Sequence, residues 1–441
     1  DGACGLNRRL EDKCGLGERT DRRDRGDPSA RRDRTCPRAG DSGRTLHRQV
    51  IPGSQQVMTT SMFAIRGDLL LGSHLAPGAV VVTDGVISGI ERGEVSDGKL
   101  PPTVIDAAIV SPGMIDLQVN GAIGREVGTD ARDIEAISAW MPSTGVTSWL
   151  PTIVTAGADY YPLVFAAWDE LDQSIGATPL GLHLEGPFLS PRRKGAHQLR
   201  FIEAASDELF TSWLDQVSVK LVTLAPERAG GHGRIRSLVA RGILTSLGHT
   251  DATYEEFVAG VDQGARMATH LFNAMSPMHH RQPGAMIATM TDERITCGLI
   301  PDGVHSHPAT VRLAINAMGI DRIAVVSDMM SACGFGPGTY GIGGQEVTVD
   351  ETSARLADGT LAGSILTMDQ AIRNLVAWSD ATVGEALHMA TAVPAGLLRD
   401  VDRGALRIGA RADITAWNGG LGIQETWVGG SSVYTATPAG R

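Results

Sequence analysis

Gly181-Leu-His-Leu-Glu-Gly-Pro-Phe-Leu-Ser-Pro-Arg-Arg-Lys-Gly-Ala-His197 is the stretch from which the fold of this 441-residue chain can be worked out. It begins as a short apolar run with the alternation of a buried strand, and it breaks at Gly186-Pro187 into a loop. Glu185 therefore lies where the strand ends. Because an unpaired carboxylate among leucines would cost several kcal/mol, the sequence predicts a cation or a proton beside Glu185.

Seven further apolar runs of similar length accompany this strand, and most are separated by segments with helical patterning of the kind that parallel strands need as crossovers. Together the eight runs cover residues 114–120, 147–153, 181–185, 219–224, 243–249, 266–270, 295–300 and 323–328. Eight such units predict an α/β fold, a (β/α)₈ barrel of the TIM type, over residues 111–394. An open doubly wound sheet is the competing architecture.

Both flanks of this central part carry short alternating strands divided by Gly, Asp and Pro. They lie between residues 63 and 110 and again after residue 405. Because chain termini often lie close together, residues 58–110 and 395–441 are predicted to pair into one small β-sandwich domain.

Residues 1–57 are rich in Arg and Asp and have almost no apolar periodicity, which predicts a disordered leader. They lack the apolar segment of a signal peptide, and Met58 or Met62 looks like a more natural start for the folded chain. An Arg-rich leader could tether the protein to RNA or to a surface, but we expect a dispensable segment.

The charge and cysteine content exclude several classes of protein. A formal net charge of -11 argues against general nucleic-acid binding, which needs an excess of Lys and Arg. No run reaches the roughly 18 apolar residues of a membrane span. Three of the five cysteines lie in the leader and no Cys-x-x-Cys pair exists, so a reducing cytoplasm is the expected compartment.

The barrel prediction brings polar residues together, because barrel active sites form at the carboxyl ends of the strands. Those ends carry Gln118, Asn120, Glu185, His249, His270, Asp302, His305 and Asp328. Among them, Glu185, His249 and His270 form a two-His-one-carboxylate set that suits a divalent ion, Zn²⁺ first, with water completing the coordination. Each residue alone is more often structural, but three at the strand ends of one barrel predict a metal site.

Two further residues each have two interpretations, one catalytic or ligand-binding and one without a functional role. Asp328 could simply cap the turn after the last strand; beside a metal, it can take a proton from water and pass it to a leaving amine. Arg281 could belong to a solvated basic patch with its neighbouring histidines; above the barrel mouth, its guanidinium would bind an anion such as phosphate through two parallel hydrogen bonds. His197, His305 and the turn 361–364 could supply further donors.

Several long motifs, in this order, resemble those of the N-acetylglucosamine-6-phosphate deacetylases of the amidohydrolase superfamily. The resemblance covers residues 62 to 430, and its motifs lie at residues 112–121, 183–188, 194–197, 247–253, 268–275, 302–305, 326–328 and 361–368. It implies a barrel with a small β domain, usually a homodimer, that hydrolyses the acetamide of N-acetylglucosamine 6-phosphate to glucosamine 6-phosphate and acetate in amino-sugar catabolism and cell-wall recycling.

Carried over position by position, the resemblance also implies roles for single residues. One divalent ion, Zn with Fe, Mn or Co as alternatives, would be held by Glu185, His249 and His270, and Asp328 would be the acid/base residue. Contacts to the sugar and its phosphate are implied for Ala196, His197, Asn273, Ala274, Arg281, His305, Leu361, Ala362 and Gly363.

The first strand departs from the superfamily's His-x-His pattern, because Gln118-Val-Asn120 stands in its place. Neutral amides are poor ligands for a second transition metal, so one ion is expected, with Gln118 and Asn120 as first-strand contacts. Three alternatives stay open: the galacto epimer of the substrate, a different amidohydrolase acting on a cyclic amide or a dipeptide, and a catalytically silent barrel that binds a sugar phosphate.

Overall fold

Eight parallel strands form the centre of the fold in the computed structural model, which describes residues 61–437. The predicted leader, residues 1–57, lies outside the described residues. The strands pair in chain order, and each overlaps one of the eight apolar runs, so the barrel prediction is confirmed. They are β5 (Met114–Val119), β8 (Val146–Val154), β10 (Leu182–Glu185), β11 (Val219–Leu224), β12 (Leu244–Leu247), β13 (Met267–Ala268), β14 (Thr296–Leu299) and β15 (Ile323–Val325).

The barrel closes just beyond the last strand. The Asp328 amide donates to the Gln118 carbonyl at 3.0 Å, and the Asn120 amide donates to the Met329 carbonyl at 2.8 Å. These bonds join the carboxyl end of β5 to the segment after β15. Closure therefore takes place at the end of the barrel where the predicted site residues lie.

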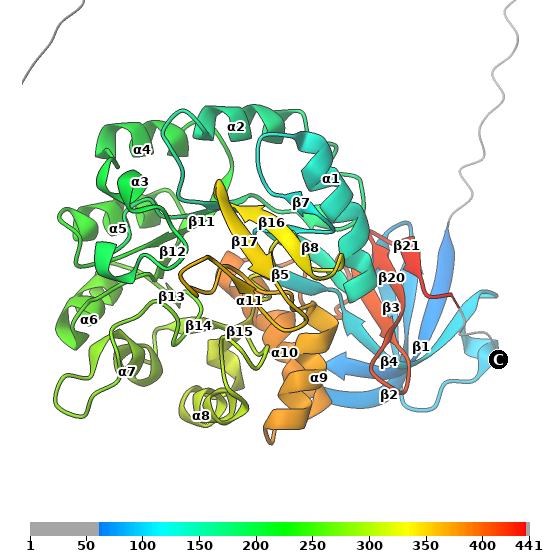
Figure 1. The fold of residues 1–441 in the computed structure, drawn as a ribbon. Coiled ribbons are helices and arrows are strands. Elements are labelled where there is room, and N and C mark those ends of the chain that lie inside the picture. The colour runs from blue at the N-terminus through cyan, green and yellow to red at the C-terminus, as the bar shows by residue number, and fades with distance from the viewer. Residues whose placement is uncertain (1–60, 438–441) are drawn as a thin grey trace, which may run out of the picture. The chain divides into compact units, whose positions relative to one another are not determined.

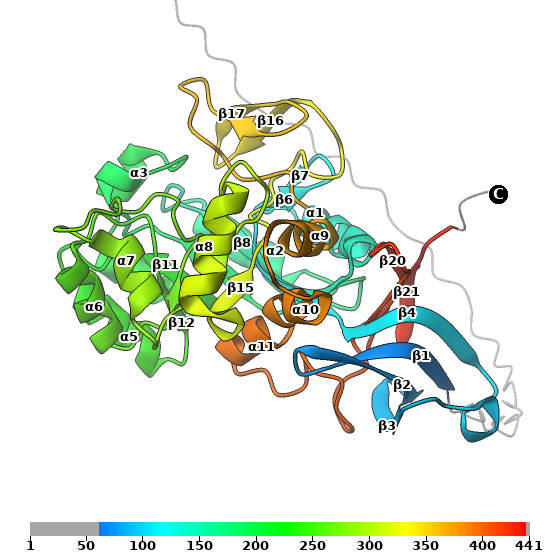
Figure 2. The ribbon, with the colours of Figure 1, turned by 90° about the horizontal axis from the view of Figure 1, so that it is seen from below.

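Helices lie outside the strands and bury their apolar faces against them (Figures 1 and 2). Two of them, α6 and α10, begin with a capping box, in which a Thr and a Glu three residues later satisfy the first backbone amides. The helices are α1 (Ala131–Trp140), α2 (Tyr161–Asp169), α3 (Leu199–Glu203), α4 (Asp207–Leu214), α5 (Gly231–Ala240), α6 (Tyr254–Asp262), α7 (Gly284–Thr291), α8 (Pro308–Met318), α9 (Met368–Trp378), α10 (Val383–Ala390) and α11 (Ala392–Leu398), with short 3₁₀ turns η1 (Asp97–Lys99), η2 (Met141–Thr144), η3 (Pro191–Arg193) and η4 (Ile320–Arg322).

Strands from both ends of the described chain form one seven-stranded sheet, as predicted. Its order is β21-β20-β19-β4-β1-β2-β3, so the C-terminal strands join the N-terminal ones through β19 and β4. Phe63 of β1 stacks on Trp427 of β20 with 5.9 Å between ring centroids, although two strands separate them in the sheet. The sheet therefore folds over a core of its own. Its strands are β1 (Met62–Leu71), β2 (His74–Thr83), β3 (Val86–Arg92), β4 (Val104–Pro112), β19 (Ile414–Trp417), β20 (Ile423–Val428) and β21 (Ser431–Thr435). The domain boundaries stay predictions.

A three-stranded sheet that the sequence did not predict contacts the barrel mouth. It contains β16 (Gly338–Ile342), β17 (Gln345–Val349) and β18 (Ala354–Arg355). The turn between its first two strands is anchored on both sides: Gln198 Nε2 donates to the Gly343 carbonyl at 2.7 Å, and the Gly343 amide donates to Glu126 Oε1 at 2.6 Å. Two short strands, β6 (Gly121–Ala122) and β7 (Arg125–Glu126), and β9 (Thr178–Pro179) beside β8 complete the strands of the described part. Within residues 61–437, no helix combines the length and the apolar character that a membrane crossing requires.

Candidate active site

A cavity of about 340 Å³ lies at the carboxyl ends of the barrel strands. Its floor carries Glu185 at the end of β10 and His249 and His270 just after β12 and β13. The chain can turn directly after Glu185 because Gly186 follows: its φ is +98°, and a Cβ there would lie 2.0 Å from Thr155 Oγ1. Only glycine fits this position, which explains the break that the sequence shows after the strand.

Three of these side chains converge on one point. Oε1 of Glu185 lies 3.3 Å from Nε2 of His249 and 3.3 Å from Nε2 of His270, and the two Nε2 atoms lie 3.1 Å apart. Ligands at about 2.0–2.1 Å from a tetrahedral Zn²⁺ ion lie roughly 3.3 Å from one another. The triangle therefore has the size of one face of a tetrahedral metal site.

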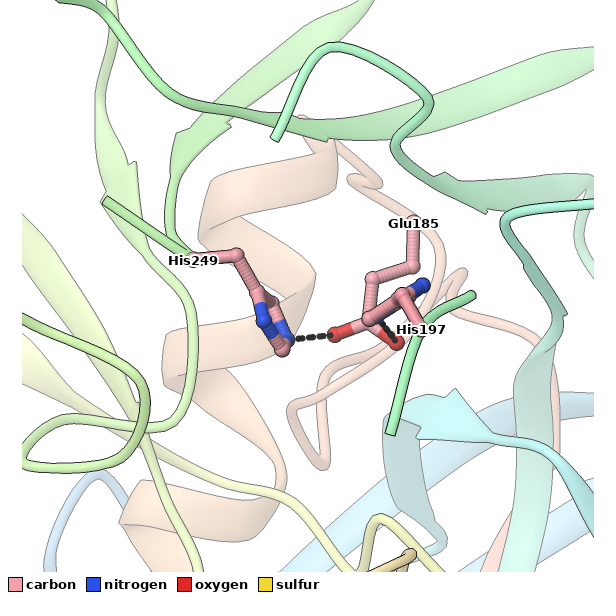
Figure 3. A group of neighbouring side chains, drawn as sticks. All are labelled: Glu185, His197 and His249. Carbon is pink, nitrogen blue, oxygen red and sulfur yellow. Dashed lines mark ion pairs between the residues drawn. The ribbon is translucent and has the colours of Figure 1, made fainter. Parts of the chain in front are cut away.

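A second grouping includes His197, because Glu185, His197 and His249 offer ligand atoms within 4.8 Å of one another. Figure 3 shows the two imidazoles beside the Glu185 carboxylate, from which His197 Nε2 is separated by 3.6 Å. The described residues thus contain a possible metal-binding cluster. Glu185 and His249 belong to both groupings, and either His270 or His197 would supply the third ligand atom.

Hydrogen bonds at the Nδ1 atoms distinguish the histidines. Nδ1 of His249 lies 2.8 Å from the Arg193 carbonyl, which can only accept, so Nδ1 carries the proton and Nε2 offers a lone pair. Nδ1 of His197 instead accepts from the Thr155 amide at 3.2 Å, so the neutral ring carries its proton on Nε2. His249 thus has the tautomer that a metal ligand requires, whereas His197 has a proton on the Nε2 atom that faces Glu185. Nδ1 of His270 has no hydrogen-bond partner among the described residues, so no neighbour fixes the tautomer of this ring.

Burial and charge shape the titration of this cluster. Burial would raise the pKa of Glu185, but the neighbouring His197, His249 and His270 outweigh it and hold the pKa well below its usual range. Burial lowers the pKa of His249 to about 4, with His197 adding to the effect. An ionised carboxylate beside a neutral imidazole is the protonation state that a metal ion requires of its ligands.

Asp328 faces the same cavity from the end of the last strand. Its Oδ1 accepts from Asn120 Nδ2 at 2.7 Å, and Gln118 Nε2 donates to Glu185 Oε1 at 3.0 Å. Burial, followed by repulsion from Glu185, raises the pKa of Asp328 to about 6. The two first-strand amides thus each hold one carboxylate of the site, which is a positional role that their residue types alone did not reveal.

The backbone is strained at these strand ends. His249, His270 and Asp328 have positive φ values of 46°, 31° and 50°. Side chains other than glycine rarely adopt this region, at a cost of roughly 1–3 kcal/mol each, and such strain gathers at functional sites. The surrounding structure therefore stabilises a conformation that these residues would avoid in a free chain.

Most of the sequence-predicted site residues meet at this cavity. Those that line it are Asn120, Glu185, Ala196, His197, His249, His270, Asn273, Ala274, His305, Asp328, Leu361 and Gly363. His305 is oriented by Asp302, whose Oδ2 lies 2.7 Å from His305 Nδ1. Gln118 contacts the cluster through Glu185, and Ala362 is buried between two lining residues.

One predicted residue lies elsewhere, and two lining residues had been missed. Arg281 is exposed, does not line the cavity, and donates to His280 Nε2 at 2.8 Å. Arg192 and Arg193 line the cavity instead, and both pair with Asp251, at 3.3 Å and 2.8 Å. Their position in the loop between Glu185 and His197 could have indicated from the sequence that they line the cavity.

A closed (β/α)₈ barrel with two imidazoles and a carboxylate at its strand ends, and a second carboxylate beside them, defines the class of metal-dependent barrel hydrolases. The chain belongs to the amidohydrolase family, whose model matches residues 109–435.

Several relatives are similar in sequence to this chain over most of their length. The chain is 38% identical over 362 residues to N-acetylgalactosamine-6-phosphate deacetylase of Escherichia coli O157:H7, which covers 79% of this chain and 93% of the relative. It is 37% identical over 348 residues to N-acetylglucosamine-6-phosphate deacetylase of Bacillus subtilis (strain 168), covering 76% and 88%. The human N-acetylglucosamine-6-phosphate deacetylase is 35% identical over 404 residues, covering 88% and 98%.

Solved structures agree with these relatives. N-acetylglucosamine-6-phosphate deacetylase from Pasteurella multocida superimposes with a TM-score of 0.79 at 30% identity, covering 84% of this chain and 99% of that one. A mutant of the Mycobacterium smegmatis deacetylase, solved in complex with N-acetyl-D-glucosamine-6-phosphate, superimposes with a TM-score of 0.79 at 32% identity. The match covers 85% of this chain and 100% of that one.

Proposed function

We propose that this chain is an N-acetylglucosamine-6-phosphate deacetylase, which hydrolyses the acetamide of N-acetylglucosamine 6-phosphate to glucosamine 6-phosphate and acetate. The observation that carries the proposal is the triangle of Glu185, His249 and His270 with Asp328 beside it in one cavity. The named activity of relatives that match over most of the chain supports the same substrate.

The donor set fits one divalent ion. Two imidazole nitrogens and one carboxylate oxygen at 3.1–3.3 Å from one another suit Zn²⁺ first, with Fe²⁺, Mn²⁺ or Co²⁺ as alternatives. Glu185, His249 and His270 would hold it, and the tautomer of His197 argues against that residue as the third ligand. When bound, the ion would supply Lewis-acid polarisation of the amide carbonyl and lower the pKa of water.

Asp328 moves the protons in the proposed reaction. Its Oδ1 is held by Asn120, so Oδ2 is the atom left to accept a proton from the attacking water. The water oxygen bonds to the carbonyl carbon, and Asp328 then gives the proton to the departing nitrogen as the C–N bond breaks. His197, with its proton on Nε2, donates a hydrogen bond to the carbonyl oxygen as negative charge develops there.

The sugar and phosphate would occupy the other side of the cavity. Asn273, Ala274, His305, Leu361 and Gly363 line it there and would contact the sugar. The phosphate has two sets of candidate cations. Arg281 is the one implied by the family resemblance, and Arg192 and Arg193 are the guanidinium groups that line the cavity of a single chain.

The galacto epimer is a second candidate substrate, because the relative from E. coli O157:H7 bears that name. We also propose a homodimer in the cytoplasm. The two cysteines of the described part, Cys297 and Cys333, are free and buried, which is in keeping with a reducing compartment.

Amine release from N-acetylglucosamine 6-phosphate tests the proposed function. We expect turnover by metal-loaded protein, little turnover after chelation, and much weaker turnover of unphosphorylated N-acetylglucosamine. The galacto epimer is assayed in parallel, and comparison of Arg281→Ala with Arg193→Ala by KM identifies the phosphate contact. A folded, metal-loaded protein that releases no amine from the gluco substrate would contradict the assignment.

A further inference from the structure

A second cavity, of about 410 Å³, adjoins the candidate active site. The two cavities share Asn120 and Val154, whose side chains form the partition between them. The turn of the β16–β17 hairpin spans both, because Ile342 lines the first cavity while Gly343 and Gly344 line the second. The second cavity is thus an extension of the reaction site rather than a separate feature of the surface.

The lining of the second cavity combines an apolar part with polar groups. Val127, Ile153, Leu163 and Phe201 contribute apolar surface, and Arg200 lies over the Phe201 ring at 4.5 Å from its centroid. The polar side chains that line it include Glu126, Asp159 and Gln198. Its size falls in the range of small-molecule sites, which are mostly apolar with a few placed polar groups.

One polar atom on the partition has no partner. Asn120 is 3% exposed, and its Nδ2 is used by Asp328, but its Oδ1 makes no hydrogen bond to any described residue. A buried carbonyl oxygen without a partner costs about 1–3 kcal/mol, so a ligand or a water is expected against it. This atom lies on the boundary between the reacting groups and the second cavity.

The geometry of an amide links the two cavities. Secondary amides are trans, so the nitrogen substituent and the acyl chain extend from opposite ends of the C–N bond. The residues proposed to contact the sugar follow β13, β14 and β15, whereas the second cavity lies over β5 and β8. In the closed ring of eight strands, β8 lies opposite β13, with three strands between them on either side, whereas β15 adjoins β5. A substrate whose sugar lies against Asn273 and Ala274, which follow β13, therefore directs its acyl chain toward β8 and the second cavity.

We propose that the second cavity accepts N-acyl groups longer than acetyl, so that the enzyme also hydrolyses N-butyryl and N-hexanoyl glucosamine 6-phosphate. This inference rests on the proposed function. The chemistry is unchanged: water adds to the acyl carbon, the C–N bond breaks, and a longer carboxylate and the same amino sugar leave. The added methylene groups pass Val154 and pack against Ile153 and Phe201.

The test compares kcat/KM for the acetyl, butyryl and hexanoyl substrates on the metal-loaded protein. We expect kcat/KM for the longer substrates to stay within about tenfold of the value for the acetyl substrate. Burial of the added methylene groups offsets the cost of displacing the partition side chains. Leu163→Trp, which adds bulk at the outer wall of the second cavity, should lower the hexanoyl to acetyl ratio by about tenfold. Leu313→Trp is the matched control: Leu313 is an exposed leucine of α8 that lines neither cavity.

The outcomes separate this proposal from the one on which it rests. Acetyl turnover with no butyryl or hexanoyl turnover would overturn the acyl proposal and leave the deacetylase assignment in place. Absence of turnover with all three substrates would overturn the deacetylase assignment itself. Hexanoyl turnover that Leu163→Trp and Leu313→Trp affect equally would show that the chain does not enter the second cavity, and it too would overturn the acyl proposal.

Discussion

Nε2 of His249 and Nε2 of His270 lie 3.1 Å apart, and each lies 3.3 Å from the same oxygen of Glu185. Because the His249 tautomer directs a lone pair at this point, a cation between the rings would stabilise the arrangement. We predict that chelation lowers thermal stability and abolishes turnover, and that Zn²⁺ restores both. An ion at 100 times its Kd stabilises the folded state by about 2.7 kcal/mol. Equal melting temperatures with and without chelator would contradict a metal at this site.

The tautomer of His197 leads to a prediction that separates the two candidate ligand sets. His270→Ala should lose bound metal, whereas His197→Ala should retain it and lose roughly 10²–10³-fold in kcat through the missing hydrogen-bond donor. Metal content by elemental analysis, measured beside kcat, gives the answer. Loss of metal from His197→Ala with retention in His270→Ala would exchange their roles.

The Arg193–Asp251 pair supports the proposed metal ligand His249 indirectly. The Arg193 carbonyl accepts a hydrogen bond from Nδ1 of His249, and the Arg193 side chain forms an ion pair with Asp251 at 2.8 Å. We predict that Asp251→Asn weakens metal affinity about tenfold, because outer partners of this kind fix the ligand ring. Asp262→Asn is the matched control, since it removes a surface pair with Arg294 at 2.8 Å and should leave metal affinity unchanged. Metal competition titrations measure both, and equal affinities would refute the link.

Asp328→Asn should separate catalysis from folding. The buried carboxylate has its pKa raised to about 6, so its charged form is disfavoured in the folded protein, and a neutral amide of the same shape removes that cost. Asn also tolerates the positive φ of 50° at this position. We expect turnover to fall by roughly 10²–10⁴-fold while the melting temperature is unchanged or higher. Exposed Asp380 offers the control Asp380→Asn, and a variant that keeps its turnover would remove Asp328 from the mechanism.

Asp116 gives the protein a pH dependence of its stability. It is fully buried on β5, and burial raises its pKa to about 7, against hydrogen bonds from Ser327 and Gln118. A carboxyl group with a raised pKa in the folded state contributes stability that is present below pH 3.8 and lost as the pH rises through 7. The loss is on the order of 4 kcal/mol. Urea unfolding at pH 5.5 and pH 8.5 should show a smaller fall for Asp116→Asn than for the parent, and an identical fall would exclude Asp116 as its source.

The sequence predicts the position of residues that lie on or directly after a barrel strand. The apolar runs ending at Glu185, His249 and His270 identify both the barrel and the residues at its mouth, because the carboxyl ends of parallel strands meet. The same reasoning does not place side chains that lie on loops. Arg281 is exposed and lies outside the cavity of a single chain, whereas Arg193 lines that cavity. The phosphate contact of Arg281 stays a prediction.

Two further features depend on contacts between distant parts of the chain. The proton position on His197 is set by the Thr155 amide, 42 residues away, and no local pattern encodes it. The β16–β17 hairpin lies in a glycine-rich stretch, and its turn is held by Glu126 and Gln198. Contacts of this kind arise only when the barrel is assembled.

The pairing of β4 with β19 has a consequence for synthesis of the protein. Ile109 and Trp417 are partners in this ladder, so the whole barrel lies between them in the chain. A ribosome therefore releases the barrel sequence before β19, the C-terminal partner of β4, exists, and the β19-facing edge of β4 stays open during that time. Such an edge is a template for pairing with other chains. The nascent protein thus passes through a stage at which it is prone to aggregation, and that stage ends when the last strands emerge.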